Sequence, residues 1–342
     1  LPIPSVAYKD IHAFGKNPTV SNGSYVLDSW NINKNIKLRV NKKYSGVREP
    51  KNAGIDFVVY DSLDSAYADL QGGNLDVLDS IPTSALGEYK NDRSIQAFSD
   101  RSSAFKSITI PQNLAHFSGE EGALRRAAIS YAIDRSSVTK KILSGAATPA
   151  TDFLAPVIAG YSKDLTGSEV LKYNAKKAKE LWAQADATYG VFTDQVPVHF
   201  SFDISDNQRW ATAVADQLRR NLGIQSFPVA GADFARFRYD FRTVRFDGAY
   251  RTGWKADYPS VRSYLEPNFA TDGASNDTEY SNDQVDELLK QADKATNPAV
   301  AVKDYEKAHG VLLEELPAIP LFFPLEAVGW KADVSNVSVD FD

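Results

Sequence analysis

The chain has 342 residues, which exceeds the usual size of one domain, so two lobes are expected. Its composition, 43% hydrophobic and 24% charged, is ordinary for a soluble globular protein. The net charge is −6 and no basic block is present, which argues against nucleic acid as a partner, and no apolar run is long enough to span a bilayer.

Two residue types are missing from the chain. The absence of cysteine excludes disulfides, thiolate metal sites and cysteine nucleophiles. The absence of methionine, even at position 1, indicates that the chain was trimmed, or that methionines were substituted or left unrecorded. Because the chain opens on Leu-Pro-Ile-Pro, an extended segment rather than the start of a domain, we expect a fragment.

Strand-like and helix-like segments alternate along most of the chain, a pattern typical of an α/β protein. The first clear group begins with an apolar strand at residues 55–60. A helix that begins at Ser62 and ends at Gly72-Gly73 follows it, and a second strand is expected at 75–78. This order predicts a compact βαβ unit.

Helices with clear capping residues are predicted in the middle of the chain. Apolar residues at helical spacing between Leu124 and Ala132 predict one helix, and Asp134 is placed to cap the next, which ends at Gly145. A further helix follows Asn174. The alternation of Val196, Val198, Phe200 and Phe202 then predicts a half-buried strand.

The last third of the chain continues this alternation. A helix ending near Gly223 and a short helix capped by Asp233 lead to a strand at 246–251. Ser281 and Gln284 have the spacing of a capping box at the start of another helix. The final helix begins at Asn297-Pro298 and ends before Pro317, and residues 319–323 form a buried strand. Proline-interrupted extended segments at 108–113 and 317–324 are predicted to cross between the lobes.

No catalytic or metal-binding motif is evident. The four histidines, His12, His116, His199 and His309, lie far apart in the sequence, and none has a partner at ligand spacing. The chain contains no P-loop, dinucleotide-binding glycine pattern or nucleophile elbow. An enzyme therefore has no support in the sequence, and no metal or cofactor is expected.

The most informative segment is residues 251–259, where the strand is predicted to break at Gly253 and to continue as a loop. The loop carries Asp257 between Trp254 and Tyr258. A carboxylate flanked by large aromatic residues at a strand end is a common way to hold a cationic group beside an apolar cleft. The alternative is a surface loop in which Asp257 caps its own turn, and spacing alone leaves both interpretations open.

Basic residues gather in front of this segment. One or two of them are expected to reach the cleft and pair with a ligand carboxylate, although a basic helix face in water is the alternative. The arginines concerned are Arg236, Arg238, Arg242, Arg245 and Arg251.

Four groups of segments follow one another in a fixed order along nearly the whole chain: 20–25 with Trp30 and 41–44, 126–135 with 143–145 and 148–150, 253–259, and 316–321. Together they resemble the motifs of a known family, the oligopeptide- and dipeptide-binding solute receptors of ABC importers. Ser24 stands where the family usually has proline, a change expected to affect only turn rigidity.

The resemblance implies a periplasmic-binding-protein-like (class II) α/β fold of two lobes that close around a short peptide. It assigns the peptide's α-ammonium to Asp257 and the floor of a side-chain pocket to Trp254. Arg251 and Arg242 stand where the family places basic residues near the ligand, and Tyr258 completes the candidate set. Extended edges would pair with the peptide backbone.

Family members are longer at the N-terminus. We therefore expect residues 1–111, with 323–342 returning to them, to form part of the first lobe, and residues 112–322 to form a complete second lobe. The implied setting is extracytoplasmic, either the periplasm or the outer surface of a Gram-positive cell as a lipoprotein. A monomer is expected, with short peptides and ABC permease subunits as partners.

Three alternatives stay open. A receptor of the same family could bind a nickel chelate, a sugar or another solute, in which case Asp257 would be dispensable. A hydrolase on an α/β scaffold would need a nucleophile or base that the sequence does not show. A sensory receptor cannot be separated from a transport receptor by this sequence.

Overall fold

The computed structural model describes residues 4–18, 20–162, 164–201, 205–231, 233–243 and 246–339, without the side chains of 205, 206 and 241–243. The chain forms two compact units, Leu1–Ser65 and Ala66–Asp342.

The first unit is built on an antiparallel sheet of three strands, β1 (Tyr25–Asn31), β2 (Asn35–Val40) and β3 (Gly54–Val58). A short 3-10 helix, η1 (Ser5–Lys9), and helix α1 (Ile11–Lys16) precede it. Asn41 follows β2, and its side-chain amide donates to the carbonyl oxygen of Gly23 at 2.8 Å. This bond holds the loop before β1 against the end of β2.

The predicted βαβ unit is wrong, although its helix is correct. Helix α2 (Leu63–Gln71) buries Ala66, Tyr67 and Leu70 and is followed by Gly73 with φ 77°. However, β3 pairs with β2, whereas β4 (Val77–Leu78) pairs with the distant strand β11 in another sheet. The strands before and after α2 therefore belong to different sheets. No local residue pattern predicts which strands pair with each other.

The second unit contains a mixed sheet of eight strands. Its order is β4-β11-β6-β10-β8-β9, and β5 and β7 also pair with β11. Strand β8 runs parallel to β9 and β10, and β10, β6 and β11 run antiparallel to one another. The bounds are β5 (Ile95–Arg101), β6 (Ala104–Thr109), β7 (Ala147–Pro149), β8 (Val198–Ser201), β9 (Pro228–Gly231), β10 (Ala249–Lys255) and β11 (Ile319–Lys331).

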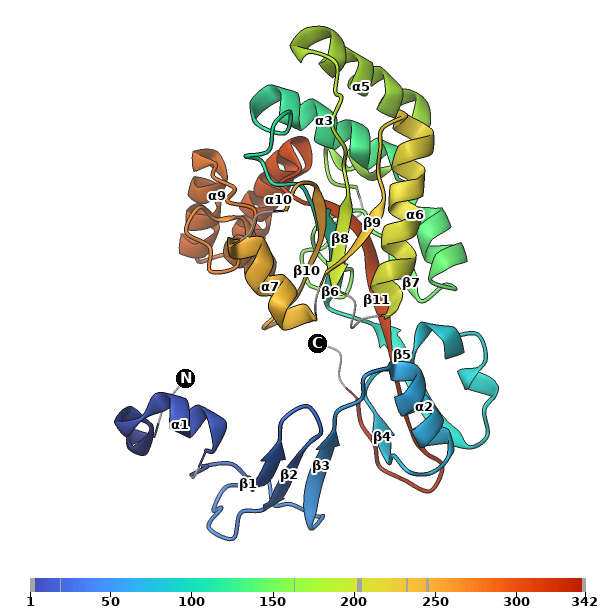
Figure 1. Cartoon of the computed structure of the whole chain (residues 1–342). Coiled ribbons are helices and arrows are strands. Elements are labelled where there is room, and N and C mark those ends of the chain that lie inside the picture. The colour runs from blue at the N-terminus through green and yellow to red at the C-terminus, as the bar shows by residue number, and fades with distance from the viewer. Residues whose placement is uncertain are drawn as a thin grey trace. The chain divides into compact units, whose positions relative to one another are not determined.

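Helices flank this sheet, with α9 and α10 to one side of β10 and α6 to the other in Figure 1. Short 3-10 and π turns lie between them: η2 (Thr83–Ala85), η3 (Tyr89–Asn91), η4 (Val138–Ile142) and η5 (Ser168–Leu171). The helices are α3 (Gly119–Ala132), α4 (Arg135–Ser137), α5 (Ala175–Tyr189), α6 (Ser205–Leu222), α7 (Phe234–Thr243), α8 (Arg262–Phe269), α9 (Asp283–Lys294) and α10 (Pro298–Glu315).

The helix caps agree with the sequence in all but one case. The side chains of Asp134, Asn174 and Asn297 accept hydrogen bonds from the first backbone N–H groups of α4, α5 and α10, which confirms those starts. The capping box at Ser281 is wrong, because Asn282 caps α9. Its amide oxygen accepts from two backbone nitrogens, at 2.9 and 3.1 Å, and the Ser281 hydroxyl instead lies 3.2 Å from that of Thr271.

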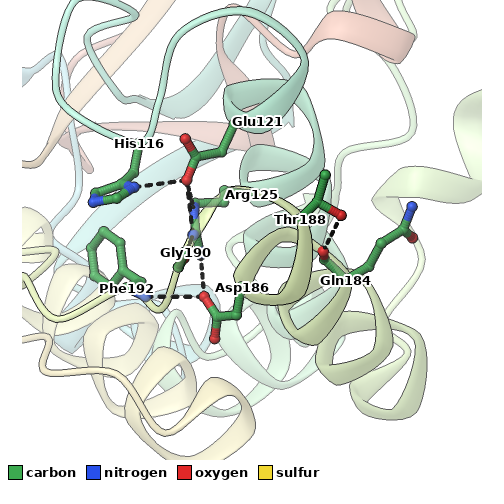
Figure 2. A network of polar contacts seen from close by, with 8 residues as sticks. All are labelled: His116, Glu121, Arg125, Gln184, Asp186, Thr188, Gly190 and Phe192. Carbon is green, nitrogen blue, oxygen red and sulfur yellow. Dashed lines mark hydrogen bonds and ion pairs between the residues drawn. The ribbon is translucent and has the colours of Figure 1, made fainter.

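A buried arginine joins α3 to α5 (Figure 2). Arg125 is fully buried, and its guanidinium lies 2.9 Å from the Asp186 carboxylate and 2.8 Å from that of Glu121. It also donates to the carbonyl oxygen of Gly190 at 3.0 Å. His116 completes the network with a 2.7 Å contact to Glu121. Because each acceptor satisfies part of a desolvated cation, the network fixes the packing of the two helices.

Candidate functional site

Strand β10 carries the segment that the sequence singled out, between antiparallel β6 and parallel β8. The predicted break at Gly253 is wrong, because the strand continues to Lys255. A Cβ atom at Gly253 would lie 2.5 Å from the carbonyl oxygen of Phe105 on β6. Gly253 therefore permits a close approach of two backbones within the sheet and does not end the strand.

Trp254 lies inside the strand and not in the loop after it. Its side chain is half-buried against the core, and its indole N–H donates to the carbonyl oxygen of Ser263 at 2.6 Å. The hydroxyl of Ser263 accepts from the backbone N–H of Asp257 at 2.9 Å. Two bonds to one residue of α8 thus hold the chain on both sides of Ala256.

Asp257 and Tyr258 lie on the loop that follows β10, and both are exposed. Within the described part of the chain, the Asp257 carboxylate makes no hydrogen bond or ion pair, and no nearby backbone N–H donates to it. Its backbone is anchored by Ser263 while its carboxylate stays open to an incoming group. That combination suits a binding residue better than a turn cap.

Arg251 lies two residues before Gly253 on the same strand. Its guanidinium sits 5.1 Å from the centre of the Phe234 ring of α7, a cation–π distance. Arg242 lies on α7, the helix that carries Phe234, but its side chain lies outside the described residues.

A small cavity of about 60 Å³ lies where β6 and β10 meet α7 and α8. Arg251 and Trp254 both line it, whereas Asp257 and Tyr258 do not. Three hydroxyls form one wall of the cavity. The Thr252 hydroxyl lies 2.7 Å from the hydroxyl of Ser107 and 3.0 Å from that of Thr109. Such a volume holds a few water molecules and not a large side chain. Aromatic rings of Phe105, Phe234, Phe237 and Phe269 also line it, together with polar side chains that include Asn268 and Thr278.

The ion pair of Arg238 with Asp277 lines this cavity, and the buried phenol of Tyr250 bonds to the same loop. Arg238 contacts the Asp277 carboxylate at 2.6 Å, and the hydroxyl of Tyr250 donates to the carbonyl oxygen of Asp277 at 2.9 Å. Burial, with the charge of Asp277 adding to it, raises the pKa of Tyr250 far above its ordinary value. The phenol is therefore a neutral donor that fixes the loop carrying Asp277.

Sequence reasoning missed Lys106 on β6, which the register places directly opposite Gly253. Burial lowers the pKa of Lys106 to about 8; Arg251 and Lys255 add to the shift, and Glu326 opposes it. The signal that was available is a single charged residue within the strand Ala104–Thr109, whose other residues are uncharged. The position of Lys106 opposite Gly253 depends on the strand register, which the local sequence does not reveal.

Neither a metal centre nor a membrane span emerges from the residues that the structure describes. No three His, Asp or Glu side chains among them are grouped so as to hold a metal ion. No helix within these ranges is both long and apolar enough to cross a membrane. Three of the histidines instead contact single carboxylates: His116 with Glu121, His199 with Asp247, and His309 with Asp152.

Comparison with known proteins gives consistent matches. Residues 1–276 match the family described as "Bacterial extracellular solute-binding proteins, family 5 Middle". The chain is 24% identical over 322 residues to the oligopeptide-binding protein OppA of Bacillus subtilis, covering 89% of this chain and 56% of OppA. It is 28% identical over 312 residues to the glutathione-binding protein GsiB of Escherichia coli K12, covering 88% of this chain and 58% of GsiB.

A solved structure extends the comparison to three dimensions. The periplasmic binding protein DppA of Helicobacter pylori, solved with the peptide STSA, superposes with a TM-score of 0.84 at 19% identity. The match covers 97% of this chain and 64% of DppA. The periplasmic-binding-protein-like α/β fold predicted from the sequence is therefore confirmed, and the chain spans a little over half the length of the two curated relatives.

Proposed function

Because the chain belongs to the bacterial extracellular solute-binding proteins of family 5, we propose that it is part of a receptor that captures short peptides and delivers them to an ABC importer. The observation that carries this proposal is Asp257: a carboxylate without a hydrogen-bond or ion-pair partner among the described residues, on a backbone anchored by Ser263. The ligands in the names of these relatives, an oligopeptide, glutathione and a peptide, support the ligand class.

Asp257 is proposed to bind the α-ammonium of the peptide. An exposed ion pair contributes only about 0–1 kcal/mol, because water screens both charges. The same pair contributes more when a closing lobe excludes water and each ion keeps its full set of hydrogen bonds. The exposure of Asp257 therefore requires a facing wall, and we propose that closure supplies it.

Trp254, Tyr258 and the arginines are proposed to hold the rest of the ligand. Because the indole N–H of Trp254 is already bonded to Ser263, Trp254 offers the ligand an apolar ring and no donor. Tyr258, 49% exposed, has both ring and hydroxyl available beside Asp257. Arg251 is proposed as a carboxylate partner, and Arg242 as a second one on α7.

The proposed lobes are residues 1–111 with 323–342, and residues 112–322. Strand β11 changes partners near residue 323, although β6, a partner of its first part, belongs to the range 1–111. The part from Ile319 to Pro324 pairs with β6 and β7, and the part from Leu325 to Lys331 pairs with β5 and β4. We propose this strand, which joins two sets of partners, as the hinge element for closure.

The family name and the relatives support an extracytoplasmic setting and a binding role without catalysis. We propose ABC permease subunits as the membrane partners, and a monomeric receptor. Periplasmic residence or lipid anchoring at an outer cell surface would both satisfy this proposal.

Calorimetry with the tripeptide Ala-Ala-Ala and its N-acetylated form tests the role of Asp257. The free-amine peptide should bind at least tenfold more tightly, and Asp257→Asn should remove that difference. Asp164→Asn, at another exposed aspartate, should leave both affinities unchanged. Equal affinity of the two peptides for the unmodified chain would contradict the proposal and favour a solute without an amine. Mass spectrometry of the peptide after incubation would expose a hydrolase through cleavage products.

A further inference from the structure

A second pocket lies at the edge of the sheet opposite to Asp257. It encloses about 470 Å³ and is lined by four short segments, at 114–117, 192–195, 225 and 247. The first of these follows β6, and the other three precede β8, β9 and β10. None of the roles proposed above for the peptide site uses a residue of this pocket.

The strand register brings these segments together and keeps them away from Asp257. Strand β8 runs parallel to β9 and β10, and Val198 lies opposite both Pro228 and Ala249. The residues that precede the three strands therefore meet at one edge of the sheet, whereas Asp257 follows the far end of β10. The seven residues of β10 span roughly 20 Å. Among the described residues, none lines both this pocket and the cavity beside Trp254.

An aromatic ring held by the Arg125 network forms part of the pocket wall. The Phe192 ring lies edge-on to Trp182 at 5.1 Å and to Phe117 at 5.9 Å between ring centres. The Arg125 guanidinium lies 5.2 Å from the centre of the same ring. The backbone N–H of Phe192 donates to the Asp186 carboxylate at 3.1 Å (Figure 2). The ring is therefore fixed in place before any ligand arrives.

The loop that carries Asp194 and Gln195 is anchored on its other side as well. The backbone N–H of Val196 donates to the carbonyl oxygen of Gln225 at 2.9 Å. The hydroxyl of Ser226 donates to the carbonyl oxygen of Val196 at 2.6 Å. Asp194 and Gln195 thus lie between two fixed points of the backbone, which lowers the entropy lost when a ligand binds.

Two carboxylates give the pocket a negative charge. The Asp194 carboxylate is exposed and makes no hydrogen bond or ion pair with a described residue. Asp247 lies 2.8 Å from Nε2 of His199. Burial lowers the pKa of His199 and Asp247 opposes that shift, so the imidazole is uncharged at neutral pH and leaves the Asp247 charge in place. Of the described residues that line the pocket, none is basic.

We propose that this pocket is a second binding site and that it takes a small organic cation, an ammonium group on an aromatic or branched apolar body. The apolar body would pack against Phe192 and Leu114, and the ammonium would pair with Asp194 and Asp247. Pockets of about 300–1,000 Å³ with apolar walls and a few convergent polar groups are typical of small-molecule sites. The two carboxylates disfavour an anion, and a neutral ligand would leave both without a partner. The inference does not depend on the proposed peptide binding.

Three probes that share a phenyl ring and differ in charge test the site: phenethylamine, phenethyl alcohol and phenylacetate. Backbone amide NMR of the isotopically labelled chain measures their affinities through the signals of Phe192 and Asp194. Phenethylamine should bind at least about threefold more tightly than the alcohol, because an exposed ion pair strengthens binding by at most about fivefold. Phenylacetate should bind most weakly. Equal affinity of the amine and the alcohol would overturn the inference.

Variants of the two carboxylates locate the amine. Asp194→Asn should reduce the preference for phenethylamine, and the double variant with Asp247→Asn should remove it. Asp257→Asn is the matched control, because Asp257 lies at the other edge of the sheet, and it should leave the preference unchanged. A preference that survives the double variant would overturn the inference. Loss of the preference in Asp257→Asn would place the amine in the peptide cleft and would overturn it as well.

A variant of opposite sign guards against misfolding as an explanation. Gln225→Glu adds a third carboxylate at an exposed position of the pocket, so phenethylamine should bind more tightly and phenylacetate more weakly. Unchanged affinities in Gln225→Glu would contradict a cation site here. Each of these results leaves the peptide-binding proposal intact, because calorimetry with Ala-Ala-Ala tests that function separately.

Discussion

The indole N–H of Trp254 donates a hydrogen bond of 2.6 Å to the carbonyl oxygen of Ser263. The hydroxyl of the same serine accepts from the backbone N–H of Asp257. Only the second bond depends on the serine side chain. Ser263→Ala should therefore free the Asp257 backbone, lower the free energy of unfolding by about 1 kcal/mol and weaken binding of free-amine peptides. Urea denaturation and calorimetry measure the two effects.

Ser260→Ala is the matched control for this change. The Ser260 hydroxyl accepts a longer bond, 3.3 Å, from the backbone N–H of Arg262 in the same loop. Its loss should affect stability less and should leave peptide binding unchanged. Equal effects of the two variants would show that the Ser263 hydroxyl does not position Asp257.

Arg125 should be among the most sensitive positions for stability. Arg125→Met leaves the carboxylates of Glu121 and Asp186 without their shared cation, and it leaves the Gly190 carbonyl without a donor. Breaking one side of a buried ion pair costs about 3–5 kcal/mol. Urea denaturation should show a loss of this size. Arg219→Met on α6 is the control, because Arg219 and Asp216 are about half exposed and such pairs contribute at most about 1 kcal/mol.

Acidic pH should destabilise the network around Arg125, because Glu121 then becomes protonated. Burial raises the pKa of Glu121, but hydrogen bonds from His116 and Arg125 outweigh burial and leave the pKa below its ordinary value. A carboxylate with a lowered pKa in the folded state stabilises the fold above its unfolded pKa of about 4.3. That contribution is lost as the pH falls through the folded-state pKa.

Glu121→Gln should therefore flatten the decline in unfolding free energy below pH ~4.3, because glutamine does not titrate. Denaturant titrations at neutral and acidic pH measure the slope. Glu180→Gln, at a side chain 54% exposed, should retain the slope of the unmodified chain. A Glu121→Gln variant as acid-sensitive as the unmodified chain would rule out this carboxylate as the source.

Replacing two glycines by alanine should change the free energy of unfolding in opposite directions. Gly253→Ala places a Cβ 2.5 Å from a backbone oxygen at φ 153°, so it should destabilise the chain by about 1–3 kcal/mol. Gly310→Ala, in the interior of α10, meets nothing within 4 Å and should stabilise it by about 0.5–1 kcal/mol. Thermal or urea denaturation of both variants checks the pair. Stabilisation by Gly253→Ala would contradict the close contact with β6.

Sequence reasoning succeeded where structure is determined locally. Asp134, Asn174 and Asn297 identified helix starts because a cap acts on the N–H groups of the next few residues. It failed for the βαβ unit around α2 and for the full length of β11, because strand pairing joins residues far apart in the chain.

The candidate site shows the same difference between features determined by local sequence and features that depend on strand pairing. Arg251, Trp254 and Asp257 could be proposed from one short segment. The meaning of Gly253 was misread because it depends on the neighbouring strand β6, and Lys106 was missed for the same reason. A site shared by two strands becomes visible only when their register is known.

Strand β11 also determines when during synthesis the sheet of the second unit can be completed. Its residues Ile319–Lys331 pair with β4, β5, β6 and β7, all of which precede residue 150. A ribosome releases those four strands long before their common partner, so each exposes an unpaired edge until residues 319–331 emerge. Protection of the nascent chain from aggregation is thus most needed while residues 150–318 are being made.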